Sequence, residues 1–169
     1  KSGQRSAEVF DITAKGNFES VNIPNRLKRN DTESDFSDEM KKLYEYRRNR
    51  TRLHLDDKIL LSWNSMMIAA MSTLYRISKN EKYLKTARNA QQFLEQNLCN
   101  DLQLYTSFRD GKRSDKAFLD DYAYYVSALI ELYNSTLDRD YFNKAELFCG
   151  EAVKRFTAEN GGFFLCQSD

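Results

Sequence analysis

The sequence predicts an all-α fold in which helical hairpins stack side by side as a double-layered ring. The first observation is that the 169 residues include one Pro and six Gly. An all-β sandwich of this length needs many more turn residues. The second is a repeat of about 58 residues, in which a mostly apolar segment is followed by an amphipathic one. The third is a hydrophobic content of 41%, which is enough to build a core.

The N-terminal part is expected to be an irregular lead-in over residues 1–37. Its apolar residues follow no lasting period, and both Gly16-Asn17 and Pro24 mark turns. The pattern that follows predicts a helix over about 38–49.

The next segments predict two helices of different character. Residues 59–77 are apolar nearly all round, which is typical of a helix enclosed by neighbours on most sides. Residues 81–98 are apolar on one face only, and a short extended return follows over 102–110. The same order then recurs as an apolar helix over 118–137, an amphipathic helix over 140–156 and an extended return over 161–165.

An offset of 58 aligns the two copies, for example Leu61 with Leu119 and Ala87 with Ala145. A single hairpin of this kind cannot bury its apolar faces alone, so the copies are expected to stack. The apolar helices would form an inner ring and the amphipathic ones an outer ring. We expect one domain, in which the lead-in is followed by a first helical unit over 38–110 and a second over 111–169.

The composition excludes several classes of function. Lys and Arg number 26 against 25 Asp and Glu, so we expect no nucleic-acid partner. The longest uncharged stretch, residues 59–75, is short for a membrane span and contains polar residues, so we expect no membrane partner. The polar N-terminus is unlike a signal peptide. Because the chain starts with Lys1, we expect an excerpt from a longer protein.

The numbers and spacing of Cys and His residues bear on cellular location and on metal and cofactor sites. Three scattered Cys without a C-x-x-C motif indicate a reducing compartment, so a cytoplasmic location is expected. One His makes a His-based metal site improbable, and no nucleotide-binding or G-x-S-x-G motif is found. We therefore expect no metal and no cofactor.

Two Asp pairs flank the starts of the two apolar helices: Asp56-Asp57 and Asp120-Asp121. Capping explains one Asp of each pair, since a carboxylate near a helix N-terminus is favoured by about 0.3–1 kcal/mol. In a ring of hairpins the inner-helix N-termini also open onto one end of a central funnel. Two carboxylates there could act as acid and base on a bound sugar. Both interpretations remain open.

Other residues near these pairs carry the same two interpretations. His54 has a side-chain pKa suited to acid–base work, or it holds the loop through Asp56 or Asp57. Trp63 either stacks on a sugar ring or belongs to the core. The catalytic candidates are Asp57, Asp121 and His54, and the substrate-binding candidates are Trp63, Asn64, Asp56, Asp120 and Tyr122.

Several of these residues carry a resemblance to one family. The motifs are G-N-F-E at 16–19, H-L-D-D-K at 54–58, S-W-N at 62–64, L-D-D-Y-A at 119–123 and G-G-F-F at 161–164. They resemble the spermatogenesis-associated protein 20 group with its bacterial YyaL-type members. The resemblance implies a thioredoxin-like domain, absent from this chain, joined to a six-hairpin α/α toroid similar to sugar epimerases and glycosidases. This chain would be a partial toroid of about two and a half hairpins.

Two functions follow as expectations. One is a carbohydrate-active domain, an isomerase or epimerase or a glycoside hydrolase, that binds a sugar or sugar derivative. The other is a non-catalytic helical scaffold or binding module that serves the thioredoxin-like domain or another protein. The exposed edges of an incomplete ring are also expected to drive self-association. The sequence leaves open whether the protein is an enzyme.

Overall fold

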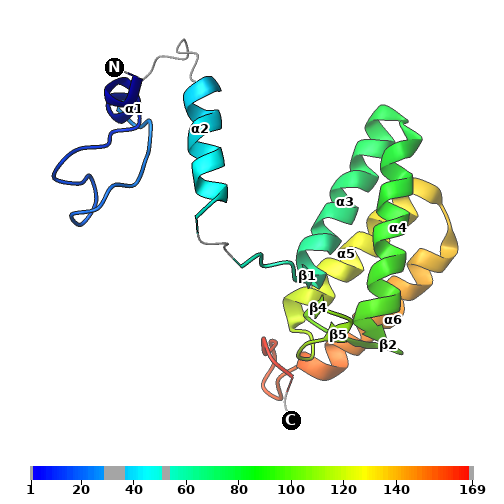
Figure 1. Ribbon diagram of the computed structural model, residues 1–169. Helices are drawn as coiled ribbons and strands as arrows, with labels where there is room; N and C mark the ends of the chain where they lie inside the picture. Colours follow the sequence, from blue (N-terminus) through cyan, green and yellow to red (C-terminus); the bar gives the residue numbers. More distant parts are fainter. Residues whose placement is uncertain (1, 29–36, 51–53, 168–169) are drawn as a thin grey trace. The chain divides into compact units, whose positions relative to one another are not determined.

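The chain forms two compact units (Figure 1). The computed structural model describes residues 2–28, 37–50 and 54–167. The first unit covers Lys1–Leu55 and the second Asp56–Asp169. The division into helical units 38–110 and 111–169 stays a prediction.

The first unit contains the helices α1 (Ser2–Val9) and α2 (Ser37–Arg48). Helix α2 confirms the helix predicted over 38–49, and none of its residues is buried. Helix α1 was not predicted, because a mostly polar segment with one buried apolar residue, Val9, has no apolar period to reveal it.

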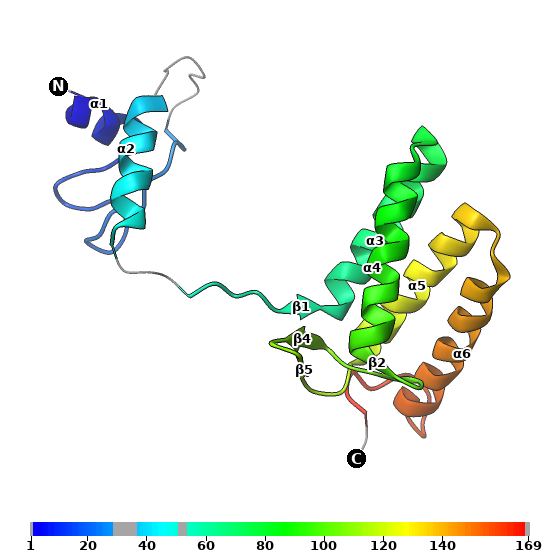
Figure 2. The same cartoon turned by 45° about the vertical axis from the view of Figure 1, so that its right-hand side comes forward.

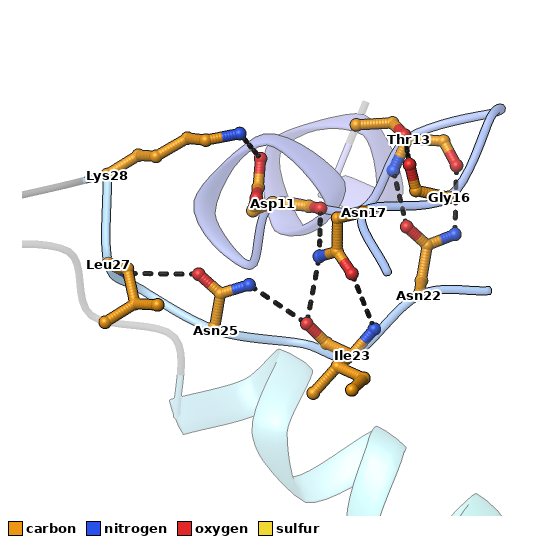
Figure 3. Close-up of polar contacts among 9 residues, drawn as sticks. All are labelled: Asp11, Thr13, Gly16, Asn17, Asn22, Ile23, Asn25, Leu27 and Lys28. Atoms are coloured by element: carbon orange, nitrogen blue, oxygen red, sulfur yellow. Dashed lines mark hydrogen bonds and ion pairs between the residues drawn. The ribbon is translucent and has the colours of Figure 1, made fainter. Parts of the chain in front are cut away.

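Asparagine side chains hold the loop between these helices (Figure 3). The Asn17 amide donates to the carbonyl oxygens of Asp11 and Ile23, at 2.7 and 2.9 Å, and its Oδ1 accepts from the Ile23 N–H at 2.8 Å. Asn22 and Thr13 exchange two further hydrogen bonds between side chain and backbone. The loop therefore satisfies its backbone groups without a regular sheet.

The second unit consists of two helical hairpins with short strands at one end (Figures 1 and 2). Helices α3 (Leu61–Ser78) and α5 (Leu119–Thr136) pack against each other and form the inner layer. Helix α4 (Glu81–Leu98) packs on α3, and α6 (Arg139–Phe156) packs on α5, as the outer layer. This all-α arrangement confirms the predicted inner and outer helices.

The strands gather where the inner helices begin (Figure 2). Strand β1 (Ile59–Leu60) pairs antiparallel with β4 (Ser107–Arg109), which pairs with β5 (Lys112–Arg113). Strands β2 (Cys99–Asn100) and β3 (Gln103–Leu104) form a separate antiparallel pair. Strands β3 and β4 lie within the extended return predicted over 102–110. In the return predicted over 161–165, Phe163 makes an isolated bridge with Thr157 in place of a strand. Ile59 and Leu60, predicted as the start of a helix, form β1 because they pair with β4.

The 58-residue repeat is confirmed at the boundaries of the helices. Both α5 and α6 begin and end 58 residues after α3 and α4. Equivalent residues make equivalent turns, because Lys79 and Leu137 both have positive φ and donate their N–H to the carbonyl four residues earlier. The side chains of Asn80 and Asp138 both cap the following outer helix.

The core lies between the two layers. Tyr125 stacks edge-on against Phe148, and Tyr122 makes the same kind of contact with Phe156. The Tyr122 hydroxyl donates to the Leu102 carbonyl and accepts from the Leu104 N–H, which attaches the first return to the second inner helix. Within the described residues, no helix combines the length and apolar character needed to cross a membrane.

Candidate functional site

The Asp121 carboxylate lies where the N-termini of the two inner helices meet. It is the third residue of α5, and its Oδ2 accepts a hydrogen bond of 3.1 Å from the Phe118 N–H. Ser62, in the first turn of α3, also contacts this carboxylate through its hydroxyl and its N–H. One buried carboxyl group thus caps its own helix and ties it to the neighbouring inner helix.

Burial raises the pKa of Asp121 above its ordinary value of 3.8. The negative charge of Asp120 raises it further, while the hydrogen bonds from Phe118 and Ser62 act in the opposite direction. The neighbouring Asp120 is exposed and accepts a hydrogen bond from the Asp121 N–H at 3.0 Å. The pair therefore combines a buried carboxyl that holds a proton more tightly with one in contact with water.

The other Asp pair is exposed and precedes strand β1. Asp57 Oδ1 lies 2.8 Å from Nε of Arg109 on β4, and Asp56 lies 3.4 Å from the Lys58 ammonium. Neither caps α3, whose N-cap residue is Leu60 without a side-chain cap. The first N–H of α3 instead donates to the carbonyl of Thr106. Asp57 is thus held by its partner arginine rather than by a helix.

The two Asp pairs occupy different steps of the repeat, although both flank an inner-helix start. The residue equivalent to Asp57 is Asp115, and the residue equivalent to Asp121 is Trp63. The 58-residue offset gives these equivalences. The motifs alone do not show them, because both pairs read Asp-Asp and both stand near the start of an inner helix. Asp115 is exposed, and its carbonyl accepts from the Thr106 N–H at 3.0 Å.

The remaining candidate residues differ in their burial. Trp63 lies on the first turn of α3 and is 68% exposed, and the Asn64 amide donates to the Leu60 carbonyl at 2.8 Å. Tyr122 is fully buried with its hydroxyl satisfied, so this position supports the core interpretation. His54 is exposed and belongs to the first unit. No group of three or more potential metal ligands is found among the described residues.

Comparison with known proteins extends this description. An uncharacterised protein of Caenorhabditis elegans is 29% identical over 135 residues, which is 75% of this chain and 18% of that protein. Spermatogenesis-associated protein 20 of Rattus norvegicus is 26% identical over 137 residues, covering 75% of this chain and 17% of that protein. This chain is related to the spermatogenesis-associated protein 20 group. The resemblance drawn from its motifs is confirmed, and the chain spans less than a fifth of the length of these relatives. No family model matches it.

Solved structures show the fold. Cellobiose 2-epimerase from Spirochaeta thermophila matches with a TM-score of 0.58 and 21% identity, over 64% of this chain and 28% of that one. A GH76 α-mannanase from Bacteroides thetaiotaomicron matches with a TM-score of 0.58 and 17% identity, over 66% and 32%. The chain is a partial six-hairpin α/α toroid, the fold that this epimerase and this mannanase share.

Proposed function

We propose that this chain supplies part of the sugar-binding mouth of a carbohydrate-active α/α toroid, which acts as an isomerase or epimerase or as a glycoside hydrolase. The observation that carries the proposal is the junction at Asp121. There two inner-helix N-termini meet at a buried carboxyl of raised pKa, and Ser62 links that carboxyl to the turn that bears the exposed Trp63.

Each side chain has a chemical role in this proposal. Trp63 offers an aromatic face on which a sugar ring stacks. Asp121 is the proton-holding carboxyl, and the exposed Asp57 is its partner in acid–base chemistry. Sugar hydroxyls would donate hydrogen bonds to the carboxylates of Asp120 and Asp56. The side-chain amide of Asn64 would form a further hydrogen bond to a sugar hydroxyl. The sugar epimerase and mannanase folds support the substrate class.

The alternative is a non-catalytic helical scaffold that serves a thioredoxin-like domain or another protein. It is favoured by the hydrogen bonds of Asp121, because a carboxylate that caps α5 and contacts Ser62 has a complete structural role. The two functions make opposite predictions about small sugars, so one experiment separates them.

The test uses the single tryptophan of the chain as its probe. Trp63 is 68% exposed, so a sugar stacked on it changes its fluorescence emission directly. The 169-residue chain is titrated with cellobiose, mannobiose and their monosaccharides, and thermal unfolding is followed in parallel. The proposal expects a saturable emission change and a raised Tm, because a ligand that binds only the folded state stabilises it.

Variants assign the signal to the site. Asp120→Asn and Asp57→Asn are expected to weaken the titration, whereas Asp101→Asn, an exposed substitution in the turn between β2 and β3, leaves it unchanged. Unaltered emission and Tm across the panel, from a chain that unfolds cooperatively, would reject the sugar site and favour the scaffold.

A further inference from the structure

The outer helix α4 carries its charges in the order that a helix dipole disfavours. Lys82, Lys85 and Arg88 all lie in its N-terminal half, and its last turn contains no basic residue. The N-terminal end of a helix carries a partial positive charge, which favours acidic side chains and repels cations. Cations three residues apart on a helix are also neighbours, so they repel one another. These three cations therefore lower the stability of α4.

Helix α6 occupies the equivalent place in the second hairpin and has the opposite order of charges. At the positions of the three cations it has two acids and no cation: Asp140, Asn143 and Glu146. Its first turn is acidic, and its last turn contains Lys154 and Arg155. Both outer helices pack on an inner helix in the same way. The fold therefore does not require the cations of α4.

The three cations line a shallow groove on the outside of α4, called here the basic groove. Its volume is about 440 Å³, and its lining consists of five exposed residues: Glu81, Lys82, Lys85, Arg88 and Asn89. Most of the lining surface is apolar, because the aliphatic stems of lysine and arginine cover it while their charged ends reach water. The groove thus combines apolar walls with a positively charged rim.

Positive charge is in excess in the basic groove. Three cations and one carboxylate give its lining a net charge of +2. The carboxylate of Glu81 accepts a hydrogen bond of 3.2 Å from the Tyr75 hydroxyl. Within the part of the chain that the structure describes, none of the three cations forms an ion pair. A negatively charged ligand would find all three available.

The basic groove is separate from the candidate sugar site. The turn at Lys79 and Asn80 joins α3 to α4, so the N-terminal half of α4 lies beside the C-terminal half of α3 (Figure 2). The Asp121 carboxylate contacts Ser62, at the opposite end of α3. None of the buried residues of α4 lines the groove, so it also lies outside the contacts that hold the hairpins together.

The spacing of the cations indicates the kind of ligand. Neighbouring cations are three residues apart, which separates them by about 4.5 Å along the axis of α4. Carboxylates three or four residues apart on a partner helix are separated by about 4.5–6 Å. On one face of an extended strand the separation is about 6.6–6.8 Å. A helix with an acid at every turn therefore matches the groove better than a strand does.

The charge of the whole chain argues against nucleic acid as the ligand. Lys and Arg number 26 against 25 Asp and Glu, so the chain lacks the basic excess that attracts a phosphate backbone. The apolar walls of the basic groove instead suit the apolar side chains of a protein segment.

We propose that the basic groove binds a helical segment of a partner protein in which Asp or Glu recurs at every turn. The carboxylates pair with Lys82, Lys85 and Arg88, and apolar side chains between them pack on the aliphatic stems. Such pairing offsets the repulsion that the three cations cause in the free chain. This inference does not depend on the sugar proposal, because the two sites share no residue.

The test uses two fluorescein-labelled helical peptides of identical composition, added to the 169-residue chain and followed by fluorescence anisotropy. In one peptide Glu recurs every three or four positions, and in the other all Glu residues form a block at one end. We expect saturable binding of the first peptide, weakened by added salt, and weaker binding of the second. Equal affinities, or no binding of either peptide, would overturn the proposal.

Charge reversal assigns the binding to the groove. Reversing all three cations, as Lys82→Glu, Lys85→Glu and Arg88→Glu together, is expected to weaken binding roughly tenfold or more. Lys154→Glu is the matched control, because it makes the same charge change at an exposed position on α6 and should leave binding unchanged. Binding that survives the triple reversal, or that Lys154→Glu weakens equally, would contradict the assignment.

Thermal unfolding shows that a loss of binding is not a loss of fold. Lys82→Glu places an acid in the first turn of α4, so its Tm should rise while its binding weakens. Lys154→Glu removes a cation from the last turn of α6, so its Tm should fall while its binding stays. A Lys82→Glu variant that loses Tm and binding together would mean that the cation supports the helix, which would contradict the argument.

A labelled single-stranded RNA oligonucleotide is the competing ligand. The proposal expects it to bind more weakly than the peptide with Glu at every turn. Tighter binding of the RNA, lost in the triple reversal, would assign the basic groove to nucleic acid and overturn the assignment to a protein helix.

Discussion

At the scale of single residues, burial and hydrogen bonding have opposite effects on the pKa of the Asp121 carboxyl. Burial raises its pKa despite the donors from Phe118 and Ser62. For a carboxyl whose folded-state pKa lies above its unfolded value, the stabilising contribution is complete below the unfolded pKa. It is lost as the pH rises through the folded pKa. Asp121 therefore favours the folded state most in acid.

This balance predicts the behaviour of Asp121→Asn. Asn keeps an oxygen for the Phe118 N–H but carries no charge to bury. We expect the free energy of unfolding of wild type to fall relative to the variant as the pH rises from below 3.8 to neutrality. Denaturant titrations across this pH range measure the difference. Asp101→Asn should show no such trend, and a wild type that gains stability relative to Asp121→Asn with rising pH would contradict the burial argument.

Gly16 makes a second prediction at this scale. Its φ is +82°, and a Cβ there would lie 2.6 Å from the Ser20 carbonyl carbon and 2.7 Å from the Val21 nitrogen. Gly16→Ala is expected to open the Asn17 loop at a cost of about 1–3 kcal/mol, since backbone strain and a clash act together. Hydrogen exchange of the Val21 N–H reports it.

The matched control is Gly111→Ala, whose φ of +74° carries strain but whose Cβ would meet nothing within 4 Å. It should increase local exchange less than Gly16→Ala does. Equal effects would show that the crowding around Gly16 is unimportant.

At the scale of elements, the two outer helices have equivalent N-caps. Asn80 and Asp138 each accept a hydrogen bond of 3.1 Å from the N–H two residues later. Asn80→Ala and Asp138→Ala are each expected to lower the free energy of unfolding by about 0.5–2 kcal/mol. Urea denaturation measures both. Asn89→Ala, in the middle of α4, should not destabilise, because Ala is a better helix former. A neutral effect of either cap variant would contradict the capping role.

The contact between α5 and the first return gives a further prediction. Tyr122→Phe removes the hydroxyl that the Leu104 N–H and the Leu102 carbonyl share. The cost should be about 1–3 kcal/mol, because the Leu104 N–H is left buried without a partner. Thermal unfolding measures it, and Tyr124→Phe, at an exposed neighbour, should cost far less. Similar losses from both variants would contradict the role assigned to this hydroxyl.

Elements were predictable where apolar spacing decides the structure. The spacing of apolar residues in the helices that contain Leu61 and Ala87 predicts which helix is inner and which is outer. It does so because burial decides how many faces of a helix must be apolar. Helix α1 carries no such pattern and was missed. The contact between Asp121 and Ser62 joins residues 59 positions apart, so no local motif contains it. The sequence placed Asp121 at a helix start but could not show that it serves two helices.

At the scale of the whole molecule, the chain holds part of a toroid, because it covers 28% and 32% of two solved toroids that it matches. Within the chain, Asp121 contacts Ser62 and so joins the two inner helices. The positions equivalent to this pair in the repeat are Trp63 and Asp120, and both are exposed. Under the sugar proposal, an aromatic face and a carboxylate near the inner-helix N-termini are therefore open to a ligand.

The exposure of Asp120 separates its sugar-binding role from a structural one. Asp120→Asn keeps an oxygen for the Asp121 N–H, so the Tm of the chain without sugar should stay unchanged. The emission change of Trp63 on sugar titration should weaken in the same variant, because the carboxylate charge is lost. A variant that unfolds at a lower temperature in the absence of sugar would show instead that Asp120 stabilises the start of α5.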